Sequence, residues 1–82
     1  MKISVSRQAK KDIKSLNEPL KSRILDAIDE LPSGDVKRLI GGKGYCRLKV
    51  GGYRVLFDMP TQDEIVIRGV APRGQIYKRG FD

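Results

Sequence analysis

Two short segments of alternating polarity, separated by a pair of glycines, constrain the fold of this chain more than any other feature. The first segment spans residues 45–50 and the second spans residues 53–57, with Gly51-Gly52 between them. Alternation with a period of two is typical of a β-strand with one buried face. Both central positions of a type I′ turn need positive φ, which glycine adopts without steric cost. The pattern therefore predicts a tight β-hairpin.

The two-residue turn also predicts which residues face each other. It places Lys49 directly opposite Arg54, and side chains alternate between the two faces along each strand. One face is mostly apolar and is expected to lie under the helices; it carries Cys46, Leu48, Val50, Tyr53, Val55 and Phe57. The opposite face is mostly basic and carries Tyr45, Arg47, Lys49, Arg54, Leu56 and Asp58.

A strand and two helices are predicted ahead of this hairpin. Ile3 and Val5 alternate with polar residues and indicate a short first strand. Ser6 is the predicted N-cap of a first helix, which has apolar residues at helical spacing. Pro19 is tolerated at the start of a second helix, whose apolar stripe runs to Leu31. A segment rich in turn-forming residues then ends that helix.

The rest of the chain is predicted to complete the sheet. Residues 36–44 form a basic loop, residues 64–71 the last strand, and residues 73–82 a short basic tail. The order is β-α-α-β-β-β, an α+β fold in which an N-terminal helical hairpin packs on one face of a small, largely antiparallel sheet. A chain of 82 residues is expected to form a single domain, residues 1–82.

Composition excludes several classes of protein. No apolar run approaches the ~20 residues of a membrane helix, and the polar N-terminus is unlike a signal peptide, so we expect a cytoplasmic protein with no membrane partner. Cys46 is the single cysteine, which excludes an internal disulfide, and histidine is absent, which removes the commonest general base. Asp58, Asp63 and Glu64 are a conceivable metal-binding set, but they flank a predicted turn. We therefore expect no metal and no cofactor.

The charge of the chain is unevenly distributed. The 17 basic and 10 acidic residues give a formal net charge of +7. Residues 36–82 contribute +6 of this charge and residues 1–35 contribute +1. A field of one sign on half of a small domain attracts polyanions, and nucleic acid is the first candidate. A solvated basic surface that aids solubility is the alternative.

The basic face of the hairpin sharpens this interpretation. Lys49 and Arg54 are predicted to be directly opposite each other, and like charges in that position destabilise a sheet. Folding gains nothing from the pair, so we expect it to serve an anionic ligand. Replacing Arg54 by alanine is then expected to leave the fold as stable as before or slightly more stable. The alternative is that exposed cations only block edge-to-edge aggregation.

RNA cleavage is one reaction that such a face can support. Attack by the RNA's own 2′-hydroxyl requires a base, cations for the charge that develops on the phosphorane, and an acid for the leaving 5′-oxygen. Clustered cations supply the second requirement directly. They also disfavour one another's charged forms, which makes Lys49, between Arg47 and Arg54, a candidate base.

Several segments, in this order and at this spacing, match one family pattern. The strongest is the hairpin from Tyr45 to Val55; the others are Ala9 to Ile13, Leu20 to Leu31, Val36 to Leu39, and the C-terminal Arg73 to Tyr77. Together they cover nearly the whole chain. The sequence in this respect resembles the RelE/ParE superfamily of bacterial and archaeal toxins from type II toxin–antitoxin modules.

The resemblance to the RelE branch implies an activity and a set of site residues. Toxins of that branch enter the ribosomal A site and cleave mRNA there, so the implied function is a metal-independent, ribosome-dependent endoribonuclease (an mRNA interferase) that inhibits translation. By position, Lys49 is the implied base, Arg54 the transition-state clamp, and Arg73 the acid or a phosphate clamp. Tyr77 would stack on or orient the nucleotide, and the choice between Lys49 and Tyr77 as base stays open. Arg47 is expected to be a phosphate clamp, because arginine is a poor proton acceptor.

The resemblance also implies partners and leaves alternatives. The partners are the ribosome with its A-site mRNA and an acidic cognate antitoxin, with a heterotetramer as one arrangement of toxin and antitoxin. The antitoxin is expected to be disordered alone and to fold around the toxin, partly on apolar surface, for example around Leu56 or the helical hairpin. The ParE branch shares the fold but poisons DNA gyrase and needs no RNA-cleaving residues. A non-catalytic basic RNA-binding protein is the third reading.

Overall fold

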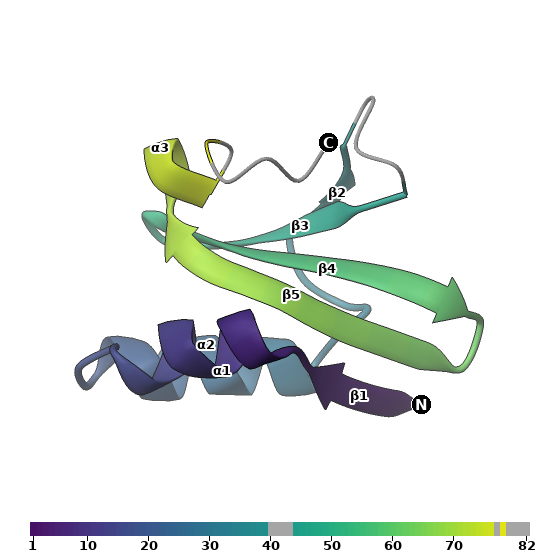
Figure 1. Ribbon diagram of the computed structural model, residues 1–82, viewed down its shortest axis with the longest axis horizontal. Helices are drawn as coiled ribbons and strands as arrows, with labels where there is room; N and C mark the ends of the chain where they lie inside the picture. Colours follow the sequence, from purple (N-terminus) through teal and green to yellow (C-terminus); the bar gives the residue numbers. More distant parts are fainter. Residues whose placement is uncertain (40–43, 77, 79–82) are drawn as a thin grey trace.

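The structure, a computed structural model, describes residues 1–39, 44–76 and 78. Figure 1 shows the elements that these residues form. In chain order they are β1 (Lys2–Val5), α1 (Arg7–Lys14), α2 (Leu20–Asp29), β2 (Val36–Arg38), β3 (Cys46–Val50), β4 (Tyr53–Thr61), β5 (Glu64–Pro72) and α3 (Arg73–Ile76). The predicted α+β class is confirmed.

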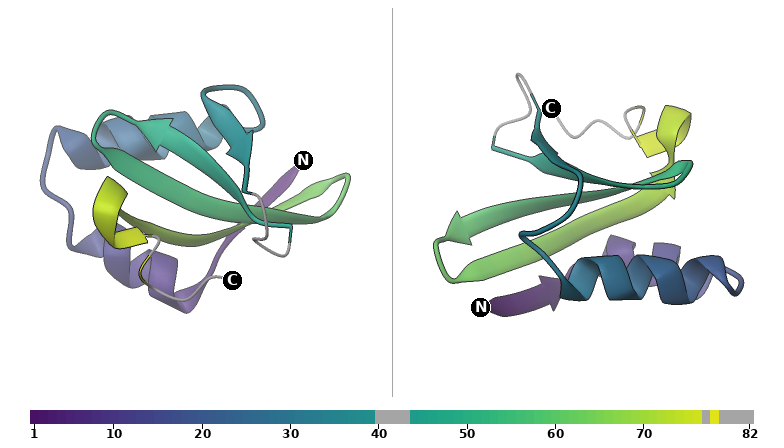
Figure 2. Two further views of the ribbon diagram at one scale, coloured as in Figure 1. Left: turned by 90° about the horizontal axis from the view of Figure 1, so that it is seen from above. Right: turned by 180° about the vertical axis from the view of Figure 1, so that it is seen from behind.

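The strands form one mixed sheet with helices on both sides. The strand order is β1-β5-β4-β3-β2. β1 runs parallel to β5, and the other neighbours are antiparallel. The helical hairpin α1–α2 covers one face of the sheet, as predicted, while α3 lies on the opposite side (Figures 1 and 2). Among the described residues, none of the helices has the length and apolar character needed to cross a membrane.

The central hairpin has the predicted register and a different turn. β3 and β4 pair antiparallel with Lys49 opposite Arg54 and Val50 opposite Tyr53. Gly51 has a φ of +58°, whereas Gly52 is not among the described glycines with positive φ. Positive φ at the first central position alone is the pattern of a type II′ turn, not of the predicted type I′ turn.

Three segments differ from the prediction. The expected basic loop contains β2, in which Val36 pairs with Leu48 and packs on the core. β4 continues to Thr61, past the expected end of the strand near Asp58. The expected tail begins with α3, which buries Ile76. Each segment is ordered by hydrogen bonds or burial against a distant part of the chain, which local periodicity does not reveal.

The sheet has an apolar cluster on each face. The main core lies between the sheet and α1–α2; its buried members are Ala9, Ile24, Ile28, Leu31, Leu48, Val50, Val55, Phe57, Ile65, Ile67 and Val70. A smaller cluster on the other face joins Leu56, Ala71 and Ile76, with Leu39 and Tyr45 packed against it. Leu56 is only 1% exposed. The prediction that it offers apolar surface to a partner is wrong, because these residues already cover it.

A β-bulge on β5 is the point where α1 attaches to the sheet. The pairing of β4 with β5 shifts register between Leu56 and Phe57, which leaves Arg68 as the extra residue. The Ser6 hydroxyl donates a hydrogen bond to the Arg68 carbonyl over 3.2 Å. The same hydroxyl accepts the backbone N–H of Ala9, which confirms Ser6 as the N-cap of α1.

Asp12 makes a second link between α1 and β5. Its side chain lies in the interface, and the residue is 8% exposed. Oδ2 accepts the backbone N–H of Val70 at 2.9 Å, and Oδ1 accepts Nε2 of Gln8 at 3.0 Å. The helix is therefore fixed to β5 at two points: its N-cap Ser6 binds the bulged residue Arg68, and Asp12 binds Val70 two residues later.

Arg54 is buried, which the sequence did not predict. It is 8% exposed, and its Nη1 donates to the carbonyls of Gly51 and Tyr53 at 3.0 and 2.9 Å. These carbonyls take up its charge in place of a ligand, so the unfavourable pairing with Lys49 is offset within the protein. The expectation that Arg54 is exposed is wrong, and its contribution to stability stays a prediction.

We expect Asp12→Ala to destabilise the domain. The substitution leaves the buried N–H of Val70 without its acceptor, which typically costs about 1–3 kcal/mol. Urea unfolding followed by circular dichroism measures this free energy. Asp26→Ala, which removes an exposed carboxylate from α2, is the matched control and should change stability by less than about 0.5 kcal/mol. Equal effects of the two substitutions would show that the link to Val70 contributes nothing.

We also expect Arg54→Ala to lower stability, because a buried stem and hydrogen bonds from a charged group are both lost. Hydrogen bonds to charged groups contribute about 1.5–3 kcal/mol, and the turn carbonyls recover part of this from water. Lys49→Ala removes the exposed cross-strand neighbour and serves as control, with an expected change within about 0.5 kcal/mol. Thermal and urea melts compare the two. A melting temperature of the Arg54 variant at or above that of the parent chain would show that Arg54 does not stabilise the fold, as the sequence analysis expected.

Candidate functional site

Three cations project from the sheet face that lies opposite α1–α2. Lys37 on β2 is paired with Arg47 on β3, and Lys49 follows two residues later on the same face. Lys37 and Lys49 are exposed, and Arg47 is partly exposed. We call Lys37, Arg47 and Lys49 the hairpin cation group. Sequence analysis placed Arg47 and Lys49 together; β2, which it missed, adds Lys37.

Arg47 is held in place by an acidic residue that sequence analysis did not select. Its Nη1 donates to Oδ1 of Asp35 at 3.1 Å and to the Asp35 backbone carbonyl at 2.9 Å. The same carbonyl also accepts the backbone N–H of Lys49 at 2.9 Å. Asp35 therefore contacts two members of the hairpin cation group. The one signal in the sequence is its position directly before the acid-free cationic segment.

Arg47 and Asp35 differ in how far each side chain is exposed to solvent. The Arg47 side chain is 17% exposed, and that of Asp35 is 60% exposed. A half-buried guanidinium with one carboxylate partner keeps free N–H donors, because arginine has five of them. Arg47 is thus oriented by Asp35 without being saturated by it, as a phosphate clamp requires.

Arg54 lies directly opposite Lys49 on the neighbouring strand and is buried. Its hydrogen bonds to the carbonyls of Gly51 and Tyr53 stiffen the turn next to Lys49. With 8% exposure it presents little surface to a ligand. Sequence analysis placed it correctly opposite Lys49, and its contact with a phosphate stays a prediction.

Arg73 reaches the same end of the sheet from another element. It is the first residue of α3, and its backbone N–H donates to the carbonyl of Gly52 at 3.0 Å. This hydrogen bond ties the start of α3 to the hairpin turn, and the Arg73 side chain is exposed. The structure therefore brings Arg73 beside the turn that follows Lys49. Tyr77, the remaining predicted site residue, lies outside the described residues.

Arg68 and Asp58 form a separate ion pair that takes both out of the candidate site. Nε of Arg68 donates to Oδ1 of Asp58 at 2.9 Å, and Nη2 donates to Oδ2 at 3.3 Å. Hydrogen bonding to the Asp58 carboxylate raises the pKa of Arg68 above its ordinary value. Asp58 is therefore a partner of Arg68, which explains its presence better than membership of an acidic metal-binding set with Asp63 and Glu64.

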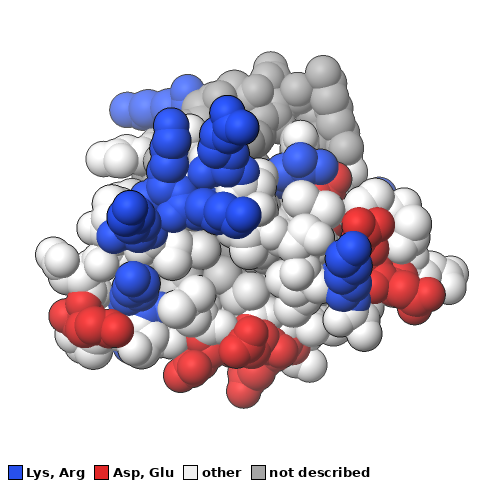
Figure 3. Space-filling model, turned by 60° about the horizontal axis from the view of Figure 1, so that its bottom comes forward, with Lys and Arg blue, Asp and Glu red and all other residues white. Residues whose placement is uncertain are grey.

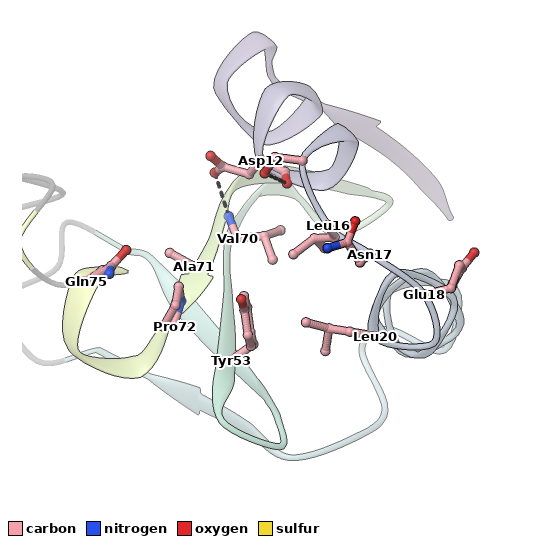
Figure 4. A pocket seen from close by; sticks show the side chains of 11 residues that line it. Asp12, Leu16, Asn17, Glu18, Leu20, Tyr53, Val70, Ala71, Pro72 and Gln75 are labelled. Carbon is pink, nitrogen blue, oxygen red and sulfur yellow. Dashed lines mark hydrogen bonds between the residues drawn. The ribbon is translucent and has the colours of Figure 1, made fainter.

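A hollow of about 530 Å³ lies at the same end of the molecule but on the side of α1 (Figure 4). Its walls come from α1, the α1–α2 link, the β4 and β5 ends and α3; the lining residues are Asp12, Ser15, Leu16, Asn17, Glu18, Leu20, Tyr53, Val70, Ala71, Pro72 and Gln75. Among its described lining residues are two carboxylates, Asp12 and Glu18, and no cation. Hydrogen bonds from Ser22 lower the pKa of Glu18, which favours its charged form.

The geometry separates two kinds of surface at this end of the domain. The hollow beside α1 is acidic and partly apolar, whereas the opposite sheet face offers Lys49, the oriented Arg47 and the nearby Arg73. Cations placed without a covering acid stabilise negative charge that develops on a phosphate.

Comparisons with known proteins identify the family. A family model described as the ParE toxin of the type II toxin–antitoxin system parDE matches residues 3–77. No curated protein matches the chain.

Solved structures share the fold. The chain is similar to the toxin fold in the RelB–RelE antitoxin–toxin complex from Methanococcus jannaschii, with 26% identity, a TM-score of 0.77, and coverage of 94% of this chain and 98% of that one. It is also similar to the RelBE2 toxin–antitoxin complex from Mycobacterium tuberculosis, with 22% identity, a TM-score of 0.75, and coverage of 88% of this chain and 90% of that one. The RelBE toxin–antitoxin complex of E. coli has 12% identity, a TM-score of 0.58, and coverage of 87% of this chain and 94% of that one. With the family model covering most of its length, the chain belongs to the RelE/ParE superfamily of toxins from type II toxin–antitoxin systems.

Proposed function

We propose that this toxin is a ribosome-dependent mRNA endoribonuclease that cleaves through attack of the RNA's 2′-hydroxyl. The observation that carries the proposal is the exposed Lys49 beside Arg47, whose guanidinium is oriented by Asp35 at 3.1 Å. A toxin that only blocks a protein target does not require a cation held in place on this face of β3. A phosphodiester bound in a defined orientation does need one.

The proposed roles follow from position and exposure. Lys49 takes the proton of the 2′-hydroxyl, Arg47 binds the non-bridging phosphate oxygens, and Arg73 stabilises the charge on the leaving 5′-oxygen. Arg54 acts indirectly, since it is buried and hydrogen-bonded to the turn that carries Lys49. Tyr77 is proposed to stack on the nucleotide, as the family resemblance implies.

The dependence on the ribosome follows from the weakness of this machinery. The chain has no histidine, so general acid–base catalysis relies on side chains whose ordinary pKa values lie far from neutrality. Precise positioning of the message can replace much of that missing contribution, because well-oriented reactions gain several kcal/mol from orientation alone. The decoding site would supply this orientation.

The antitoxin is the second proposed partner. The three solved relatives named above are toxin–antitoxin complexes, and the net charge of +7 favours an acidic partner. We propose that its antitoxin segment covers or displaces the hairpin cation group. Because Leu56 is already buried within the toxin, the apolar part of this contact must come from other residues.

Inhibition of DNA gyrase is the second candidate function. The observation that favours it is the matching family model, which describes a ParE toxin. The buried state of Arg54 also weakens one of the catalytic assignments. The two candidates differ in target, so one paired experiment separates them.

We expect Lys49→Gln to reduce ribosome-dependent cleavage by about 100-fold or more, the usual contribution of a general base. Toeprinting on a translated message measures cleavage, and a gyrase supercoiling assay runs beside it with the same preparations. Lys21→Gln, on α2 and away from the sheet face, removes the same charge and should retain activity. Full activity of the Lys49 variant would eliminate the proposed base. Gyrase inhibition without a toeprint would replace the proposed function by the second candidate.

Free RNA should be a poor substrate compared with mRNA on the ribosome. The expectation follows from the reliance on positioning, because a free oligonucleotide is not held in an attack geometry. Single-turnover cleavage of a short oligonucleotide and of the same sequence in the ribosomal A site provides the comparison. Comparable rates in the two settings would contradict the proposed dependence on the ribosome.

A further inference from the structure

The outer face of α1 carries only cations among its charged side chains. Four of its eight residues are basic and exposed, namely Arg7, Lys10, Lys11 and Lys14. At 3.6 residues per turn these four positions fall within an arc of about 100° on the helix surface. The buried residues Ala9 and Asp12 lie on the opposite side of the helix. We call the four basic residues the α1 stripe.

Among the described residues, no acidic side chain forms an ion pair with the α1 stripe. None of its members takes part in the ion pairs of the described residues, which join Arg47 to Asp35 and Arg68 to Asp58. The one acid of α1, Asp12, is buried and bonded to Val70. Figure 3 shows Lys and Arg side chains gathered on one part of the helix-bearing side, while most of the acidic side chains lie in groups nearer its margins.

Folding does not favour this arrangement. Arg7 with Lys11 and Lys10 with Lys14 are like-charge pairs at i,i+4, and each destabilises a helix by about 0.2–0.5 kcal/mol. The helix dipole disfavours Arg7 in the first turn and favours Lys11 and Lys14 in the last turn, so it gives the stripe as a whole no clear advantage. Packing of α1 is already provided by Ser6 and by the buried face. The stripe is therefore better explained by a ligand than by stability.

The composition of the face indicates the kind of ligand. The exposed residues of α1 are the four cations, Gln8 and Ser15 at its end, with no apolar or aromatic side chain among them. The centre of a protein–protein interface is rich in aromatic and apolar residues and poor in lysine. Single-stranded nucleic acid is bound on aromatic platforms. Lysine-rich, non-aromatic surface suits the phosphates of a double helix, whose charge density is high and regular.

The stripe and the hairpin cation group lie on opposite sides of the molecule. α1 covers one face of the sheet (Figure 1). Lys37, Arg47 and Lys49 alternate along their strands with the core residues Val36, Leu48 and Val50, so they project from the other face. The stripe is about 12 Å long, from eight residues at 1.5 Å each, which spans several successive phosphates of a duplex.

We propose that the α1 stripe binds the phosphate backbone of double-helical RNA while the hairpin cation group engages the message. The choice of RNA, and its place beside the message on the ribosome, rest on the proposed function; the preference for the phosphates of a double helix rests on the side chains of α1. The binding would be independent of sequence and strongly dependent on salt, because phosphate contacts release counterions.

The test measures binding of the full chain to an RNA duplex of about 16 base pairs by fluorescence anisotropy, from about 50 to 200 mM salt. The double variant Lys10→Gln, Lys14→Gln should bind more weakly and flatten the slope of log K against log salt by about 2, since each phosphate contact contributes about 0.9. Its thermal stability should be equal to that of the parent chain or higher, because a like-charge pair is removed.

Lys2→Gln with Arg23→Gln is the matched control. It removes the same charge from two exposed positions, on β1 and α2, outside both cation groups, and should leave most of the slope intact. Equal slopes for the two double variants would overturn the proposal, since only net charge would then matter. Weaker binding of the α1 variant to an acidic antitoxin, with unchanged binding to the duplex, would also overturn it and assign the stripe to the antitoxin.

A toeprint separates this inference from the proposed function. Loss of duplex binding and of ribosome-dependent cleavage in the α1 variant, with both retained in the control, supports the two together. If the salt slope depends on α1 but the chain does not cleave mRNA, duplex binding by the stripe is supported and the proposed nuclease activity is contradicted. Full cleavage and full duplex binding by the α1 variant would contradict the proposed role of the stripe and would be consistent with the proposed nuclease activity.

Discussion

The attachment of α1 to the bulge of β5 determines how charge is arranged on this toxin. Ser6 binds the carbonyl of Arg68, and Asp12 binds the N–H of Val70, so helix and strand are joined at the extra residue and again two residues after it. A bulge leaves backbone groups without ladder partners, and these two side chains satisfy them. Because the link fixes the rotation of α1, its cations must face away from the sheet. Arg68, displaced by the bulge, is free to pair with Asp58.

The hairpin shows that a pair of like charges is not by itself evidence of a ligand. Lys49 and Arg54 face each other as predicted, yet their surroundings differ completely. Arg54 turns its guanidinium to the carbonyls of its own turn, while Lys49 stays exposed. One cation of the pair is thus part of the fold and the other is available for chemistry. Burial, and not charge or register, distinguishes the two.

The sequence was sufficient for the features that depend on local periodicity. The register of β3 with β4, the cap at Ser6 and the two helices follow from spacing and turn residues, and all are present. Features that depend on distant contacts were not predictable. β2 is three residues long and ordered by pairing with β3, and Leu56 is covered by Ile76, twenty positions further along the chain. An alternating pattern assigns a residue to a face but does not reveal what covers that face.

Charge was misread for a related reason. Residues 1–35 sum to a net charge of +1, which conceals a cationic α1 and the exposed acids of α2 and its end, Asp26, Asp29 and Glu30. The sum treats these helices as one surface, whereas the fold turns their charged faces in different directions. Electrostatic attraction between exposed charges fades within about 8–10 Å at physiological salt. A ligand therefore responds to the cations of one face and not to the total, which is why a nearly neutral segment can hold a strongly basic surface.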